Sequence, residues 1–150
     1  MSIIVRQATI HDLDVVAPLF DAYRQFYAQP ADLALSRRFL AERFQHAESV
    51  ILLALNEADG EGVGFTQLYP LFSSVRATRR YLLNDLFVTP ARRRFGVAAA
   101  LLHAATAHAR AMGVSGMSLS TANDNVAAQR LYESMGWELE QGFREYHLTL

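Results

Sequence analysis

The stretch TPARRRFGVAAALLHAA, residues 89–105, decides the fold because it places three arginines and a glycine directly before a run of small apolar residues. Residues 95–112 are rich in alanine, and Val97 and Leu101 recur with helical spacing, so we predict a helix that ends at Gly113. Its first turn would present unpaired main-chain N–H groups and the positive end of the helix dipole, which together attract anions. The stretch therefore predicts a phosphate site at the start of a helix.

Small residues and arginines support that interpretation, but an alternative stays open. Gly96 and Ala98 have little or no side chain, so a phosphate could approach the main chain, and the arginines at 92–94 would add positive charge. The spacing alone fits a solvated arginine cluster before an ordinary helix equally well. A nucleic-acid surface is disfavoured, because the formal charge of the chain is −1 and no aromatic residues alternate with the arginines.

The composition indicates one globular domain spanning residues 1–150. Hydrophobic residues make up 51% of the chain and charged residues 19%, and there are no repeats or linkers. No segment approaches the roughly 20 apolar residues needed to cross a bilayer, and residues 1–6 do not begin a signal peptide. We therefore expect a cytoplasmic protein with no membrane or nucleic-acid partner.

Two missing residue types exclude several kinds of chemistry. The chain has no cysteine, which excludes disulfides and thiolate nucleophiles, and all 14 of its Lys or Arg residues are arginine. Lysine-dependent phosphate loops and Schiff-base catalysis are excluded as well. His103 and His108 are five residues apart and cannot share one helix face as metal ligands, so we predict no metal.

The first half of the chain alternates between helical and strand patterns. A Thr9-x-x-Asp12 capping pattern introduces the first predicted helix, which Pro30 terminates. The expected elements are a strand at 3–7, helices at 13–27 and 32–46, and a hairpin at 50–71.

The next strand, RRYLLNDLFVTP at 79–90, has apolar residues on both alternating faces, as a central strand does. These are Tyr81, Leu83 and Phe87 on one side and Leu82, Leu86 and Val88 on the other. Asn84 and Asp85 interrupt the strand, and burying them costs several kcal/mol unless each is hydrogen-bonded. Either Asp85 is satisfied by a neighbouring loop, or it binds substrate or handles a proton beside a cleft.

The last third predicts a strand, a helix and a final strand. Met117 and Leu119 belong to the strand, Asn123 or Asp124 caps the helix, and Gly136 ends it. The terminal REYHLTL, residues 144–150, alternates apolar side chains to its end and predicts an ordered last strand.

Two motifs in this order resemble those of the GNAT superfamily of N-acetyltransferases. Residues 93–98 fit the pattern Arg/Gln-x-x-Gly-x-Gly/Ala after a Leu-Phe-Val strand. A second run fits Asn-x-x-Ala-x-x-Leu-Tyr-x-x-x-Gly-Phe/Trp, with Asn125, Ala128, Leu131, Tyr132, Gly136 and Trp137. GFTQLYPLFSS at 64–74 and LNDLFV at 83–88 are most similar to the histone and polyamine acetyltransferase branch.

The resemblance implies an α/β (α+β) GNAT fold. Its central sheet would be mixed and mostly antiparallel, with six to seven strands that splay apart in the middle and about four helices on both faces. Acetyl-CoA would lie in the opening as co-substrate. The implied cofactor-binding residues are Phe87, Val88, Arg93, Arg94, Phe95, Gly96, Val97, Ala98, Asn125 and Ala128.

The resemblance also implies roles for these residues. Main-chain N–H groups from Arg94 to Ala98 would hold the pyrophosphate, and Phe87 and Val88 would bond the pantetheine arm through their main chains. A primary amine would attack the thioester in a ternary complex, with Tyr132 as general acid. Asp85 would hold the ammonium and accept its proton. The candidate substrate-binding residues are Asn84, Asp85, Tyr23, Tyr27 and Tyr69, and Ser73 and Ser74 are further candidates to line the acceptor pocket. Each of these tyrosines and serines fits an ordinary core or loop position as well.

One departure from the branch concerns the acceptor. Polyamine acetyltransferases of this kind have Glu-Asp where this chain has Asn84-Asp85, so half of the anionic amine site is absent. The expected acceptor is a small polyamine-like amine or a lysine-type amine of a peptide. The alternative function is a non-catalytic module that binds acyl-CoA. The resemblance further implies a homodimer formed through the C-terminal region.

Overall fold

The computed structural model describes residues 1–150, which fall into two compact units, Met1–Leu119 and Ser120–Leu150. The first unit contains the sheet and three of the four α-helices. Its elements are β1 (Ile3–Gln7), α1 (Leu13–Phe26), α2 (Leu33–Gln45), β2 (Val50–Asn56), β3 (Gly62–Ser73), β4 (Thr78–Val88), α3 (Val97–Ala111) and β5 (Met117–Ser118). The second unit holds α4 (Val126–Ser134).

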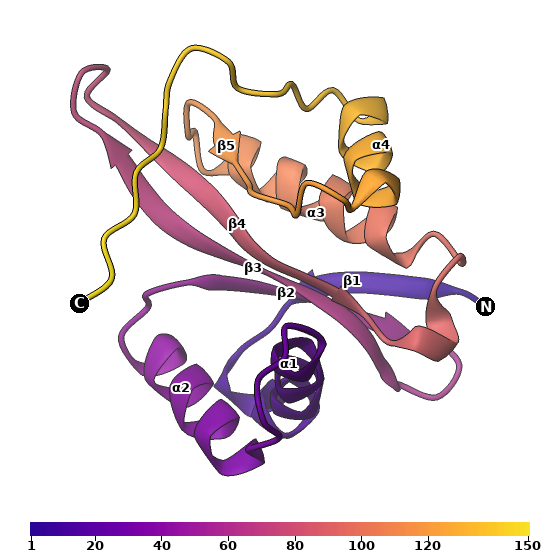
Figure 1. Cartoon of the computed structure of the whole chain (residues 1–150). Helices are drawn as coiled ribbons and strands as arrows, with labels where there is room; N and C mark the ends of the chain where they lie inside the picture. The colour runs from indigo at the N-terminus through magenta and orange to yellow at the C-terminus, as the bar shows by residue number, and fades with distance from the viewer. The chain divides into compact units, whose positions relative to one another are not determined.

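Within the first unit the strands follow the order β1-β2-β3-β4-β5. The first four are antiparallel, and β4 pairs with β5 in parallel. Helices α1 and α2 cover one face of the sheet and α3 covers the other (Figure 1). The predicted mixed sheet and four helices are confirmed, and the predicted helix and hairpin boundaries agree with the structure within about two residues.

The predicted number of strands is wrong, because the sheet has five rather than six to seven. β5 is only two residues long, and the predicted strand at 144–150 is neither helix nor strand. Tyr146, Leu148 and Leu150 are at least 83% exposed. Alternating apolar residues form a strand only when a neighbouring strand pairs their main-chain groups, and no strand in the structure does so for this segment.

A β-bulge in the middle of β4 explains why both faces of this strand looked apolar. Gln67 of β3 pairs with Asp85, whereas the next pair joins Leu68 to Leu83. Asn84 is therefore an extra residue with no partner on β3. Such a bulge reverses the alternation, so Leu83 faces α3 and Asp85 faces α1 and α2.

The bulge also corrects the predicted grouping of Tyr81, Leu83 and Phe87 on one side of the strand. The ring of Tyr81 lies 5.9 Å from that of His108 on α3. Phe87 instead belongs to the core cluster under α1 and α2, where its ring centroid is 6.4 Å from that of Phe65. The two residues therefore lie on opposite faces of the sheet.

A buried carboxylate joins α1 to α2. Asp21 Oδ1 accepts hydrogen bonds from the Ser36 hydroxyl at 2.7 Å and from the Asp32 main-chain N–H at 3.1 Å. Asp21 Oδ2 accepts a third from Gln25 at 3.1 Å. Because Asp21 and Ser36 are both buried, no solvent molecule can readily replace these partners.

We expect Asp21→Ala to lower the free energy of unfolding by about 2–4 kcal/mol, because it leaves the Ser36 hydroxyl and the Asp32 N–H without an acceptor. Urea unfolding followed by circular dichroism measures the change. Asp14→Ala on the same helix is the control, since the Asp14 side chain is 82% exposed in its ion pair with Arg37, and a loss below about 1 kcal/mol is expected there. Equal losses in both variants would contradict the assignment.

In the second unit, α4 begins one or two residues later than the predicted caps imply. Asn125, rather than Asn123 or Asp124, is the N-cap, and its side-chain oxygen accepts from the Ala128 N–H at 3.4 Å. The helix is followed by Gly136 at φ +92°, a conformation that glycine adopts at low cost.

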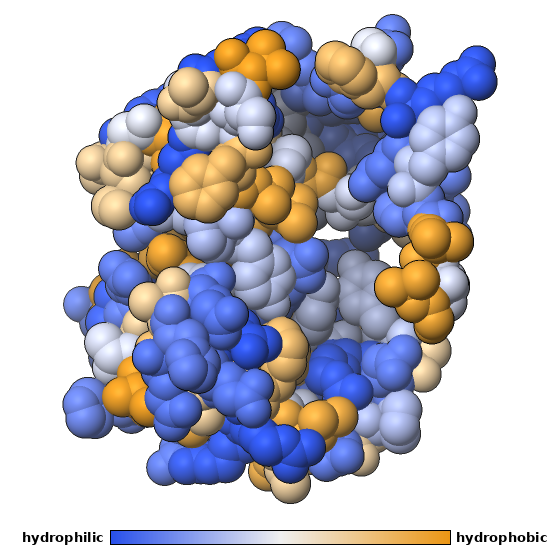
Figure 2. All heavy atoms as spheres, turned by 90° about the vertical axis from the view of Figure 1, so that its left-hand side faces the viewer, coloured by the Kyte–Doolittle hydropathy of each residue, from blue (hydrophilic) through white to orange (hydrophobic).

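Exposed apolar side chains on the face drawn in Figure 2 form small groups separated by hydrophilic residues. That distribution is ordinary for a protein surface. None of the helices combines the length and the apolar character that crossing a membrane requires.

Candidate functional site

The start of α3 presents a row of unpaired main-chain donors. Gly96 is its N-cap at φ +76°, and Arg94 also has a positive φ of +69°. None of the N–H groups of residues 94–99 donates to another group of the protein. A Cβ at Gly96 would meet no atom within 4 Å, so the space beside it is open. The local geometry is that of an anion-binding helix start.

The three arginines before this helix have different surroundings. Arg92 forms an ion pair with Glu61 at 2.9 Å. Arg93 donates from Nε to the Val88 carbonyl at 3.1 Å and lies over the ring of Phe26 at 5.6 Å. Arg94 makes neither an ion pair nor a side-chain hydrogen bond. Two of the three guanidinium groups are therefore bonded within the fold.

The edge of β4 next to this helix start is open over half of its length. β5 pairs with β4 only at Tyr81 and Leu82, so no strand pairs with Leu83–Val88 on that side. On the side that faces β3, the Thr89 N–H donates to the Val63 carbonyl at 2.9 Å, just beyond the pair formed by Val88 and Gly64. Alternation along an antiparallel pair then directs the main-chain groups of Phe87 toward β3 and those of Val88 toward the open edge.

Asp85 lies at the bulge and is only 1% exposed. Its Oδ1 accepts from Asn84 Nδ2 at 2.8 Å, and its Oδ2 accepts from Gln67 Nε2 at 2.7 Å. Gln67 in turn accepts from the Ser49 hydroxyl at 2.7 Å. The carboxylate is therefore satisfied by side chains of the sheet and not by a loop.

Burial raises the pKa of Asp85 from 3.8 to about 6, and the hydrogen bonds from Asn84 and Gln67 oppose the shift. A carboxyl group with a pKa near neutrality can exchange a proton under physiological conditions. The sequence left open whether Asp85 is satisfied by hydrogen bonds within the protein or handles a proton. The structure shows the hydrogen bonds, and these do not prevent Asp85 from handling a proton.

Two of the predicted substrate-binding tyrosines lie beside Asp85 and its bulge. The Tyr23 hydroxyl donates to the Asn84 carbonyl at 3.2 Å, joining α1 to the bulge. Tyr27, 56% exposed at the end of α1, packs edge-on against Tyr23 with ring centroids 5.1 Å apart. The structure therefore brings Tyr23, Tyr27, Asn84 and Asp85 to one region.

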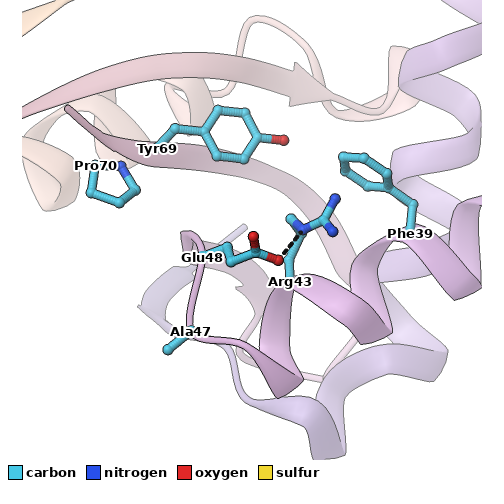
Figure 3. A pocket seen from close by; sticks show the side chains of 6 residues that line it. All are labelled: Phe39, Arg43, Ala47, Glu48, Tyr69 and Pro70. Carbon is cyan, nitrogen blue, oxygen red and sulfur yellow. Dashed lines mark hydrogen bonds and ion pairs between the residues drawn. The ribbon is translucent and has the colours of Figure 1, made fainter.

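Tyr69 lies in a pocket of about 630 Å³ between α2 and β3. The other lining residues are Phe39, Arg43, Ala47, Glu48 and Pro70, and Figure 3 shows the Tyr69 hydroxyl pointing toward the side where Phe39 and Arg43 lie. The pKa of Tyr69 is raised by burial and, secondarily, by the negative charge of Asp85. Ser73 and Ser74 lie apart from this pocket, at the end of β3 and in the turn after it.

The remaining predicted residues belong to the second unit. Tyr132 is on α4, with its ring centroid 6.2 Å from that of Trp137. Asn125 and Ala128 form the cap of the same helix. Ala128 and Tyr132 are four residues apart and lie on one face of α4, and Asn125 is at its N-terminal end.

The sequence interpretation missed the residues that contact Asp85 and Tyr69 from other elements. Gln67 and Ser49 form the hydrogen-bonded chain behind Asp85, and Phe39 and Arg43 line the pocket. The only signal for Gln67 was a polar residue in a buried strand pattern. No group of three or more His, Asp or Glu side chains is arranged to hold a metal ion.

Comparisons with known proteins agree on one family. Residues 16–137 match the Acetyltransferase (GNAT) family. The chain is 47% identical over 146 residues to the "Uncharacterized N-acetyltransferase YhfO" of Bacillus subtilis (strain 168), and the aligned region covers 97% of each protein. A "Probable acetyltransferase" of Haemophilus influenzae is 34% identical over 91 residues, covering 61% of this chain and 62% of that protein.

Solved structures show the same fold. The crystal structure of a "probable acetyltransferase" has a TM-score of 0.93 at 43% identity and covers 100% of this chain and 98% of that one. A ribosomal-protein-alanine N-acetyltransferase from Brucella melitensis biovar Abortus 2308 has a TM-score of 0.83 at 21% identity, covering 99% of this chain and 100% of that one. At this lower identity the likeness concerns the fold alone.

Proposed function

The chain belongs to the GNAT family of acetyltransferases, and from that premise we propose that it transfers the acetyl group of acetyl-CoA to a primary amine by direct attack in a ternary complex. The observation that carries the proposal is the row of unpaired N–H groups at residues 94–99, next to the open edge of β4. A diphosphate and an extended amide-bearing arm need such a pair of features.

The diphosphate of acetyl-CoA would be held at the start of α3. The free N–H groups supply hydrogen bonds, the helix dipole supplies positive potential, and Gly96 leaves room for the phosphate to approach. Arg94 is the arginine whose side chain is available to add charge, because Arg92 and Arg93 are bonded within the fold.

The open edge of β4 would bind the pantetheine arm and the thioester. Val88 is the residue proposed to donate its N–H to the thioester oxygen, since its main chain faces that edge. A donor placed where negative charge develops lowers the barrier to attack by the amine. The Phe87 main chain faces β3, so the Phe87 side chain, packed in the core, would instead keep the strand in position.

Asp85 and Tyr132 are proposed to handle the two protons of the reaction. The attacking amine must lose a proton, and the buried Asp85 carboxylate would accept it through a bridging water. The departing thiolate must gain one, which the Tyr132 phenol would supply. Tyr23 would keep the bulge in place through its bond to the Asn84 carbonyl.

The test combines binding with turnover. Calorimetry with acetyl-CoA measures uptake, and release of free coenzyme A measures transfer to a panel of diamines, amino acids and basic peptides. We expect micromolar binding and turnover on a subset of the panel. A folded protein that does not bind acetyl-CoA, or binds it and acetylates none of these amines, would refute the proposed function.

The pH dependence should follow ionisation of Asp85. Because the acting form is the carboxylate and its pKa is about 6, kcat/KM should rise with pH and at pH 5 be about a tenth of its plateau value. Asp85→Asn should remove this rise, and Asp59→Asn in the β2–β3 turn is the control. An unchanged pH profile in Asp85→Asn would show that another group titrates.

The raised pKa of Asp85 also affects stability, which should fall with rising pH whereas kcat/KM should increase. The folded protein holds the Asp85 proton more tightly than the unfolded chain, so the free energy of unfolding should fall as the pH rises from about 4 to about 6. Asp85→Asn should reduce this fall, as urea unfolding at several pH values can measure.

Residues 1–150 would act as one acetyltransferase domain, because the family match runs from residue 16 to 137 and so includes both compact units. A cytoplasmic location and a homodimer formed through the C-terminal region complete the proposal. Size-exclusion chromatography with light scattering tests the dimer.

A further inference from the structure

We propose that the pocket between α2 and β3 binds a carboxylate of the amine acceptor, so that the preferred acceptors are aliphatic amines with a carboxylate several bonds away. This inference rests on the proposed function, since it names the class of amine that the same site would acetylate. The pocket lies wholly within the first unit, and its volume of about 630 Å³ is ample for such a molecule.

Arg43 is held in one orientation at the wall of this pocket. Its Nε donates to Glu48 at 3.2 Å, and its guanidinium lies over the Phe39 ring, 4.3 Å from the centroid. The side chain is only 18% exposed. Little conformational freedom therefore remains to be lost when the guanidinium binds a ligand.

The donors of Arg43 are not all used by these contacts. Its Nη2 lies 3.4 Å from Glu42, and its Nη1 makes no hydrogen bond or ion pair within the protein. A guanidinium has five N–H groups, so at least three remain for an anion. Figure 3 shows the guanidinium directed into the space between Phe39 and Tyr69.

Tyr69 offers a second donor on the opposite wall. Its hydroxyl points toward the side of the pocket where Arg43 lies (Figure 3). Burial and the charge of Asp85 raise its pKa, so the phenol stays protonated and can donate at physiological pH. A guanidinium and a phenol facing one space form a pair of donors suited to a carboxylate.

The same contacts make the pocket a poor site for a second ammonium group. An aromatic ring can attract a cation over its face, but Arg43 already occupies the face of Phe39. Glu48 is the one carboxylate among the residues that line the pocket, and it is already paired with the Arg43 guanidinium. A polyamine would therefore bring an extra positive charge beside Arg43, which is unfavourable.

The position of Asp85 sets the spacing of the acceptor's two groups. Tyr69 and Gln67 lie on the same face of β3, two residues apart, with main chains separated by roughly 7 Å. The Gln67 side chain bonds to Asp85 and also to the Tyr69 hydroxyl, so it lies between the two groups. An amine beside Asp85 and a carboxylate bound by Arg43 on the far side of Gln67 thus need a chain of several atoms between them, which an ω-amino acid provides and glycine does not.

The experiment compares 5-aminopentanoate with pentylamine, which has the same chain without the carboxylate. We expect kcat/KM for 5-aminopentanoate to be at least about tenfold higher, mainly through KM, as one charged hydrogen-bonded contact would give. Arg43→Gln should reduce kcat/KM for 5-aminopentanoate about tenfold more than for pentylamine. Arg38→Gln, an exposed arginine on the same helix, is the control and should leave the preference intact.

Tyr69→Phe keeps the ring and removes only the second donor, so it tests the pocket if Arg43→Gln folds poorly. It should also reduce the preference for 5-aminopentanoate. Equal kcat/KM values for the two amines, a preference for 1,5-diaminopentane, or a preference unchanged in both variants would overturn the inference and leave the proposed function standing. Binding of acetyl-CoA without turnover on any amine would refute the proposed function itself.

Discussion

Gly96→Asp is expected to weaken acetyl-CoA binding by at least about 100-fold, because it places a carboxylate among the N–H groups proposed to hold the diphosphate. Aspartate tolerates the left-handed conformation better than most residues, and the space beside Gly96 at φ +76° is open, so the variant should fold. Calorimetric titration with acetyl-CoA and with free coenzyme A measures the loss, which should be similar for both ligands because both carry the diphosphate.

The chain offers a closely matched control for this variant. Gly113, which follows the C-terminal end of α3, has φ +71°, and a Cβ there would likewise meet no atom within 4 Å. Gly113→Asp thus makes the same change in backbone strain and in net charge at the opposite end of that helix. Its acetyl-CoA affinity should be within about twofold of the parent protein. A similar loss in both variants, or none in Gly96→Asp, would place the diphosphate elsewhere.

Tyr132→Phe is expected to lower kcat by about 10²–10⁴-fold with little change in acetyl-CoA affinity. The substitution removes the phenolic proton proposed for the departing thiolate and keeps the ring that packs against Trp137, so α4 should retain its local structure. Steady-state release of coenzyme A and calorimetric binding separate the two quantities. The deficit should shrink for acetyl donors with more acidic thiol leaving groups, because these need less protonation.

Tyr146→Phe is the matched control, since Tyr146 is 83% exposed in the C-terminal segment. Its kcat should equal that of the parent protein. If Tyr132→Phe retained full activity, the thiolate would leave without this acid. If the parent protein bound acetyl-CoA but gave no turnover with any amine, a non-catalytic binding module would explain the two motifs better.

The sequence predicted well those elements whose signals are local. The Thr9-x-x-Asp12 capping pattern, in which Asp12 accepts from the Thr9 N–H at 2.8 Å, and periodic apolar residues were sufficient to locate α1, α2 and α3. The bulge at Asn84 could not be predicted, because it is defined by the pairing of β4 with β3, and the sequence of β4 alone does not reveal that pairing. The polar pair Asn84-Asp85 marked its place without revealing its geometry.

The predicted strand at 144–150 is the opposite case, because a local signal was present and the strand is not. REYHLTL has strand periodicity, but periodicity reports only that one side of a segment could be buried. Whether a strand forms depends on a neighbour for its main-chain groups, and the five-stranded sheet supplies none. The count of six to seven strands came from the family resemblance, not from local signals.

The candidate site was predictable where one segment forms it. Residues 93–98 carry their motif in consecutive positions, so the free N–H groups at the start of α3 followed from local geometry. The pocket could not be predicted, because Arg43 and Tyr69 come from a helix and a strand that only the tertiary fold brings together. For the same reason, the sequence did not show that Arg92 pairs with Glu61.

Because Asn84 is the single residue of β4 without a partner on β3, a deletion of this residue would change the surroundings of Asp85 without changing the pairing of the sheet. The pairs on either side of Asn84 are already in register with β3, so loss of that one codon would leave a regular ladder between the same partners. It would, however, remove the amide that bonds Asp85 and the carbonyl that accepts from Tyr23. A lineage could thus lose or gain this arrangement in one in-frame step, without rebuilding the core.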